Sequence, residues 1–155
     1  MISLILAGKV GSSIASELGS MRVSEQIDAL EIMGVNSASF LILPKIIATI
    51  FFFPFLVIIS MGIGMVGAWI GGLSVDVTTA DFLSGLKYDF NPFYVTYSLI
   101  KTVVFAFIIA SVSSYFGYFT KGGSIAVGKS STKAVVSSSI LILVCNFILT
   151  NLLLA

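Results

Sequence analysis

The charged and apolar positions divide the chain into long uncharged segments. Residues 46–75, 102–120 and 134–155 contain no Asp, Glu, Lys or Arg. A helix rises about 1.5 Å per residue and the hydrocarbon core of a bilayer is about 30 Å thick, so about 20 apolar residues are enough to cross it. The pattern therefore predicts transmembrane helices over 41–75, 95–120 and 134–155, with an outer loop over 76–94.

Small residues near the start of the chain recur every four positions. One row holds Ala7, Gly11, Ala15 and Gly19, and a second row beside it begins with Gly8 and Ser12. Small residues at this spacing let two membrane helices approach closely, whereas a flexible Gly/Ser linker has no reason to keep a period of four. We therefore predict that residues 1–20 form the end of a transmembrane helix. The same spacing at Gly64 and Gly72 predicts close packing of the first long span.

Composition supports a membrane protein. Apolar residues make up 57% of the 155 residues and charged residues only 10%, whereas soluble domains carry about 25% charge. The predicted fold class is all-α: an integral membrane helical bundle with three full transmembrane helices, the end of a further one, and a short cytoplasmic helix. The whole chain, residues 1–155, is predicted to be one transmembrane domain.

The distribution of basic residues predicts the orientation in the membrane. Three spans place Lys87 and Lys101 on one side, and the other side holds six basic residues: Lys9, Arg22, Lys45, Lys121, Lys129 and Lys133. Cytoplasmic loops carry the excess of Lys and Arg. The six-residue side is therefore expected to be cytoplasmic and the C-terminus periplasmic.

Several kinds of chemistry lack the residues that they need. The chain has no His and one Cys, which excludes a disulfide framework, a Cys/His zinc site and a His-based catalytic triad within it. A net charge of +1 gives no electrostatic basis for binding nucleic acid. We predict no catalytic residue, no metal and no cofactor.

Two glycine motifs match nucleotide-binding patterns by letter only. Residues 123–130 read G-x-x-x-x-G-K-S, and residues 62–67 read G-x-G-x-x-G. The phosphate loop needs a preceding strand and an acid that helps to hold magnesium, yet an uncharged span precedes the first motif and no Asp or Glu follows Asp89. We interpret 123–130 as a basic cytoplasmic turn and 62–67 as a helix-packing surface.

Two polar features outside the cytoplasmic side have structural interpretations. Thr78 and Asp81 resemble a capping box that opens a short amphipathic helix on the membrane surface. Asn146 lies within the last span, where its side chain either joins helices or belongs to a transport route. The three outer aspartates, Asp76, Asp81 and Asp89, show no metal-ligand spacing and are interpreted as solvated charges.

The segment between the first small-residue rows and the first long span holds a concentration of charge. Ser24 can cap a short helix and Gly34 suits its end. Within it, Ile27, Leu30 and Met33 mark an apolar flank, and the acidic residues mark a polar one. Such a helix either docks a soluble cytoplasmic partner or is a solvated connection, and the pattern alone leaves both open.

The run from Ala7 to Val35, AGKVGSSIASELGSMRVSEQIDALEIMGV, closely resembles the signature of the MlaE family, and the tail from Gly128 to Thr150 resembles the end of that family. These proteins are permease subunits of bacterial ABC transporters that move phospholipids between the inner and outer membranes. The resemblance implies that residues 21–34 form a coupling helix that docks into a separate ATPase. Its candidate contact residues are Glu17, Arg22, Glu25, Gln26, Asp28 and Glu31.

The resemblance has further implications for assembly and location. It implies a second permease copy, two ATPase subunits, an MCE-domain protein on the outer side, and a place in the bacterial inner membrane. Family members have a longer N-terminus, so this chain is expected to begin inside their second span, and the residues of the lipid pocket are not assigned. The family often has an acid where this chain has Asn146. The alternative function is a membrane scaffold or small channel-like oligomer that has no ATPase partner.

Overall fold

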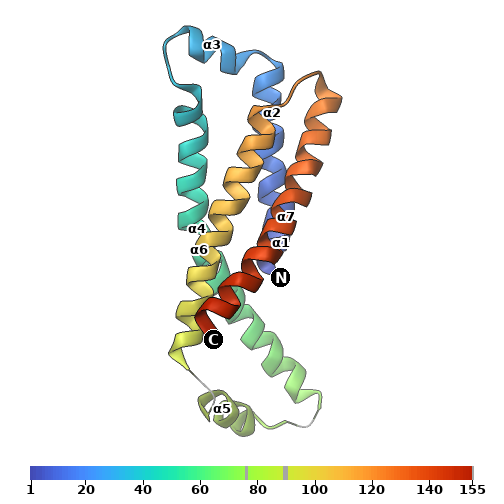
Figure 1. Cartoon of the computed structure of the whole chain (residues 1–155). Coiled ribbons are helices and arrows are strands. Elements are labelled where there is room, and N and C mark those ends of the chain that lie inside the picture. Colours follow the sequence, from blue (N-terminus) through green and yellow to red (C-terminus); the bar gives the residue numbers. More distant parts are fainter. Residues whose placement is uncertain (76, 89–90, 155) are drawn as a thin grey trace.

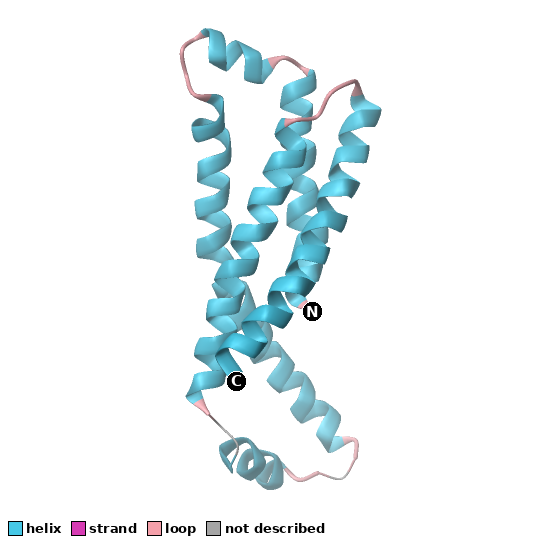
Figure 2. Ribbon diagram, in the orientation of Figure 1, coloured by secondary structure: helices cyan, strands magenta, loops and turns pink. Residues whose placement is uncertain are grey.

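The computed structural model describes residues 1–75, 77–88 and 91–154, and for residues 153 and 154 it describes the backbone only. The described residues form helices and the turns between them and contain no strand, so the predicted all-α class is confirmed. The elements, coloured as helix in Figure 2, are α1 (Ile2–Leu6), a π-helical turn η1 (Ala7–Gly11), α2 (Ser12–Val23), α3 (Gln26–Ile32), α4 (Ser37–Leu73), α5 (Thr79–Tyr88), α6 (Pro92–Tyr118) and α7 (Ser124–Leu154).

Helix α6 lies at the centre of the bundle and packs against α2, α4 and α7, and α2 also packs against α7 (Figure 1). The short helix α3 joins α2 to α4 at one end of the bundle, where the turn from α6 to α7 also lies. Helix α5 lies at the opposite end. The three longest helices, α4, α6 and α7, are each long and apolar enough to cross a membrane.

Helix α4 is longer than a bilayer requires. Its 37 residues amount to about 55 Å of helix, against about 30 Å of hydrocarbon. Two prolines, Pro44 and Pro54, lie inside it, and each removes a backbone hydrogen bond and can bend the helix. Figure 1 shows the second half of α4 diverging from α6 and α7 toward α5.

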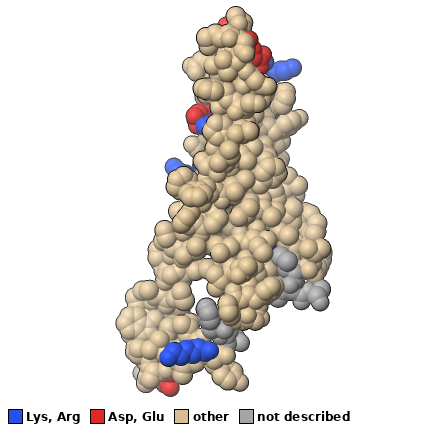
Figure 3. Space-filling view, turned by 90° about the vertical axis from the view of Figure 1, so that its left-hand side faces the viewer, with Lys and Arg blue, Asp and Glu red and all other residues tan. Residues whose placement is uncertain are grey.

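The interior is narrow and consists largely of small residues. Ala15, Ala106 and Ala110 are fully buried, together with larger side chains such as Leu18 and Ile109. Many large apolar side chains instead lie on the outside of the bundle, where a bilayer would cover them. On the face shown in Figure 3, charged residues gather toward the two ends and a broad uncharged band separates them.

The predicted cap of the outer helix is present. The Thr78 hydroxyl oxygen lies 3.3 Å from the backbone nitrogen of Asp81, whose N–H donates to it, and the helix that follows is α5. The Thr78 hydroxyl also donates to the Asp81 carboxylate at 2.5 Å. Asp76 and Asp89, also interpreted from sequence, lie outside the described residues.

Candidate functional site

The candidate site is the α3 segment, residues 24–36, which turns the chain from α2 into α4. Its start differs from the sequence prediction, because Ser24 does not cap α3. The Ser24 hydroxyl donates instead to the Ser20 carbonyl at 2.8 Å and ends α2. Glu25 occupies the cap position of α3 in a left-handed conformation, with φ of 59° and no side-chain capping bond.

The end of α3 follows the sequence prediction. Gly34 has φ of +78°, a left-handed conformation that glycine adopts without steric cost. The backbone N–H of Val35 donates to the Leu30 carbonyl at 3.1 Å, the bond that closes this kind of helix end. Asn36 then caps α4, since its side-chain oxygen accepts from the backbone N–H of Ser39 at 3.2 Å. The capping role of Asn36 was not predicted, although Asn is a favoured N-cap residue.

Three residues from three helices meet at the inner side of α3, and we call them the Glu31 cluster: Glu31, Ser37 and Tyr118. The Ser37 hydroxyl donates to Glu31 Oε1 at 2.8 Å, and the Tyr118 hydroxyl donates to the same oxygen at 3.0 Å. Ser37 is only 2% exposed. The bond from Ser37, followed by the bond from Tyr118, holds the pKa of Glu31 below its ordinary value. The cluster therefore fixes an ionised α3 carboxylate against α4 and α6.

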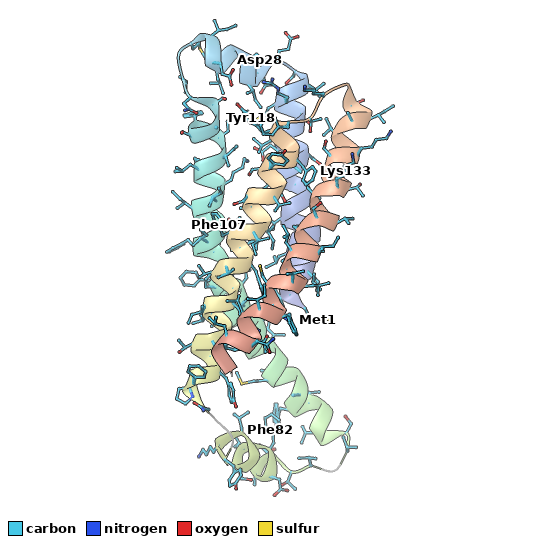
Figure 4. The ribbon with its side chains drawn as sticks, in the orientation of Figure 1. Met1, Asp28, Phe82, Phe107, Tyr118 and Lys133 are labelled. Atoms are coloured by element: carbon cyan, nitrogen blue, oxygen red, sulfur yellow. The ribbon has the colours of Figure 1, made fainter. Side chains whose placement is uncertain are left out.

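Two ion pairs also join these helices, one between α2 and α3 and the other between α2 and α4. Arg22 of α2 pairs with Asp28 of α3 at 2.5 Å, and the Arg22 guanidinium also lies 5.9 Å from the centre of the Tyr118 ring. Lys45 of α4 pairs with Glu17 of α2 at 2.6 Å. Figure 4 shows Asp28 and Tyr118 at the α3 end of the bundle. Four of the six predicted contact residues, Glu17, Arg22, Asp28 and Glu31, thus bond within the chain.

The outer side of α3 presents a different set of residues. Glu25 and Gln26, two of the predicted contact residues, are exposed at its start, and their contact with an ATPase stays a prediction. At its end Ile32 is 87% exposed and Met33 68% exposed, whereas Ile27 of the predicted apolar flank is fully buried. Ile32 was not among the predicted contact residues. Its position next to Met33, which was predicted to lie on the apolar flank, was the sequence feature that could have indicated an apolar contact surface here. The exposed surface thus combines one acid and one amide with two large apolar side chains.

The predicted packing residues separate into two groups. Ala7, Gly11, Ala15 and Gly19 are buried; a Cβ on Gly11 would lie 2.8 Å from Ser113 Oγ and one on Gly19 3.2 Å from Val127. By contrast, a Cβ on Gly8 or Gly64 would meet nothing within 4 Å, and one on Gly72 only Val77 at 3.7 Å. Ser12 donates to the Lys9 carbonyl at 3.1 Å, a bond along its own helix. Close packing through Gly8, Gly64 and Gly72 thus stays a prediction for contacts beyond this chain.

Asn146 makes a bond between helices. The Lys101 ammonium of α6 donates to the Asn146 side-chain oxygen of α7 at 2.9 Å and to the Thr150 hydroxyl at 2.8 Å. Lys101 also lies 4.3 Å from the centre of the Tyr97 ring. Asn146 therefore joins α6 to α7, which is the first of the two roles that the sequence left open.

The residues that match a phosphate loop by letter do not form one. Helix α7 begins at Ser124, so Gly128, Lys129 and Ser130 lie within a helix and not in a loop. The backbone N–H groups of a helix interior bond to carbonyls four residues earlier and cannot surround a phosphate.

Comparison with known proteins identifies the family. The family model described as Permease MlaE matches residues 1–152. A probable ABC transporter permease protein of Rickettsia bellii is 42% identical over 98% of this chain and 59% of its own length. A similarly named protein of Synechocystis is 35% identical over 99% of this chain and 59% of its own length. The chloroplast protein TRIGALACTOSYLDIACYLGLYCEROL 1 of Arabidopsis thaliana is 34% identical over 96% of this chain and 43% of its own length.

These matches agree with the resemblance noted from the α3 region and the tail. The chain spans 59% of the length of the Rickettsia and Synechocystis relatives that it matches. Because the family model covers nearly all of these 155 residues, the chain belongs to the MlaE permease family.

Proposed function

We propose that this chain forms part of the membrane permease of an ABC transporter that moves lipids, and that α3 couples it to a separate ATPase. The observation that carries the proposal is the attachment of α3. Its inner side is bonded to α2, α4 and α6 through Arg22, Ser37 and Tyr118. A force applied to α3 would therefore move three helices together, which is what a coupling element has to do.

The names of the relatives support a transporter and, in one case, a lipid. Several relatives are named as probable ABC transporter permeases, and the Arabidopsis relative is named for a galactolipid. The finer proposal is a phospholipid moved between the inner and outer bacterial membranes, with a second permease copy and an outer MCE-domain protein.

The contact with the ATPase would use the exposed side of α3. Replacing Ile32 and Met33 together with glutamate should lower co-purification of the ATPase about tenfold or more, because a central apolar contact typically contributes about 2 kcal/mol or more. The measurement is pull-down of the assembled transporter from membranes of cells that produce all of its subunits. Glu25→Lys tests the acidic part of the same surface without breaking an internal ion pair, which Asp28→Lys would do.

The matched control changes the same kind of side chain at the other end of the molecule. Leu83 and Leu86 of α5 are exposed, and their double replacement by glutamate should leave the ATPase bound. Unchanged co-purification and ATPase activity in the α3 variant would refute the coupling role.

The alternative is a scaffold or channel-like oligomer. Gly64 fits this alternative, because a Cβ added there would meet nothing within 4 Å and the exposed residue leaves room for another chain, as it also would for a second permease copy. A scaffold predicts that no ATPase co-purifies even with unaltered α3, so the same pull-down separates the two functions.

The proposed location is the bacterial inner membrane, with α3 in the cytoplasm and the C-terminus in the periplasm. In a Cys145→Ser background, Gln26→Cys on α3 should resist a membrane-impermeant maleimide in intact spheroplasts, and Ser84→Cys on α5 should react. Permeabilised cells supply the control, since both cysteines should then react. Labelling of the α3 cysteine alone in intact spheroplasts would reverse the topology.

A further inference from the structure

We propose that a pocket between the end of α6 and the start of α7 binds the phosphate-bearing headgroup of an anionic lipid. The pocket has a volume of about 410 Å³. Part of its lining comes from the turn between α6 and α7, which lies at the same end of the bundle as α3 (Figure 1). We call it the lysine pocket; it is lined by Tyr115, Phe116, Phe119, Thr120, Lys121, Ala126, Lys129, Ser130 and Lys133.

The charge of the lysine pocket is positive and uncompensated within the described chain. Its three cations are Lys121, Lys129 and Lys133, and no carboxylate lines it. The two ion pairs of the described residues use Arg22 and Lys45 instead. Lys129 and Lys133 are four residues apart on α7, so one helix face presents both of them, and Lys121 approaches from the preceding turn. Three lysines that line one pocket favour a ligand with phosphate charge.

The remaining walls suit the membrane interface. Tyr115 and Phe119 are both exposed, and their rings lie 5.0 Å apart between centres. Aromatic side chains at the end of a membrane helix sit at the level of lipid headgroups. Among the lining residues, the hydroxyl of Thr120, two residues after the end of α6, donates to the Ser130 hydroxyl of α7 at 2.9 Å. A lipid would place its phosphate among the lysines and its chains beside the rings, whereas a free anion would leave the rings without a ligand.

Lys129 can bind a lipid phosphate although the residues around it do not form a nucleotide-binding loop. Its neighbours in sequence match a phosphate loop, but they lie in helix α7. What remains is a lysine side chain on a helix face, which binds as a point charge. The proposal is independent of lipid transport, because a scaffold in the same bilayer would expose the same pocket.

A fluorescence reporter inside the pocket tests the proposal. The chain has one Trp, so Trp69→Phe with Phe119→Trp leaves a single indole at the pocket wall. In vesicles, brominated phosphatidylglycerol should quench this indole at a lower mole fraction than brominated phosphatidylcholine does. Each lysine that contacts the headgroup should lower the mole fraction needed by about fivefold. Lys129→Gln and Lys133→Gln should each reduce this preference several-fold, and Lys129→Arg should retain it.

A charge-matched control separates the pocket from general surface charge. A Cβ on Gly128 would meet nothing within 4 Å, so Gly128→Lys combined with Lys129→Gln moves the cation off the pocket face without changing the net charge. This double variant should lose the preference, and Lys87→Gln at the opposite end should keep it. If the double variant retained the preference for phosphatidylglycerol, the proposal that the lysine pocket binds the headgroup would be refuted. Displacement of the brominated lipid by millimolar inorganic phosphate would assign the site to free anions and overturn the lipid assignment.

Discussion

Replacing Gly117 with alanine should lower the stability of the helical bundle by about 1–3 kcal/mol, the usual cost of adding atoms to a filled interior, and valine should prevent folding. An added Cβ at Gly117 would lie 2.8 Å from the Ala15 carbonyl oxygen, 2.9 Å from Leu18 Cβ and 3.0 Å from Ala15 Cα. Two of these atoms belong to the α2 backbone, which cannot move aside as a flexible side chain does. The measurement is the melting temperature of the detergent-solubilised protein by size-exclusion chromatography after heating, where alanine should lower it by several degrees.

Other glycines provide a graded comparison. Gly11→Ala should lower the melting temperature less than Gly117→Ala does. Its new Cβ would meet the Ser113 hydroxyl at 2.8 Å, and that side chain can rotate. Gly67→Ala should have little effect, since nothing lies within 4 Å. Equal melting temperatures for the Gly67 and Gly117 alanine variants would contradict the close approach of α2 to α6.

The transmembrane spans could be predicted from sequence because they depend only on the absence of charge over about 20 consecutive residues. Uncharged segments such as 46–75 must lie in an apolar medium wherever their neighbours lie. The first small-residue row, from Ala7 to Gly19, likewise lies on the buried face of η1 and α2, whereas a Cβ on Gly8 of the second row would meet nothing within 4 Å. Neither row identified Gly117 of α6 as the partner of this face, although Gly117 lies one turn after the small residue Ser114 in the sequence.

The bonding of α3 could not be predicted in the same way. Glu31 and Tyr118 are 87 positions apart, and nothing local to either residue indicates the other. The resemblance implied Asp28 and Glu31 as contact residues for an ATPase, and nothing in their local sequence indicated that their carboxylates also bond within the chain. The Ser24 cap failed for a local reason, because this hydroxyl had a competing acceptor one turn earlier at the end of α2.

Tyr118→Phe should loosen the attachment of α3 while leaving the rest of the bundle folded. The substitution keeps the ring and removes only the hydroxyl that donates to Glu31 and lies 2.8 Å from the Ser37 hydroxyl. Loss of this one bond should accelerate hydrogen exchange of the α3 backbone a few-fold. If the proposed function holds, the same variant should keep its ATPase bound but transport less lipid per ATP hydrolysed. Tyr88→Phe is the matched control, because Tyr88 is almost fully exposed at the end of α5.

The pH dependence of α3 supplies the second measurement on the same bond. The Ser37 and Tyr118 hydroxyls lower the pKa of Glu31, so the attachment is fully present above the pKa of an unfolded Glu, about 4.3, and is lost as the pH falls through the lower folded value. Exchange of α3, corrected with the denatured chain, should therefore be constant from about pH 8 down to about pH 5. In Tyr118→Phe the loss should begin at a higher pH than in the unaltered protein, because one of the two bonds that favour the carboxylate is gone. An identical onset in both proteins would mean that the Tyr118 hydroxyl does not stabilise the ionised form of Glu31.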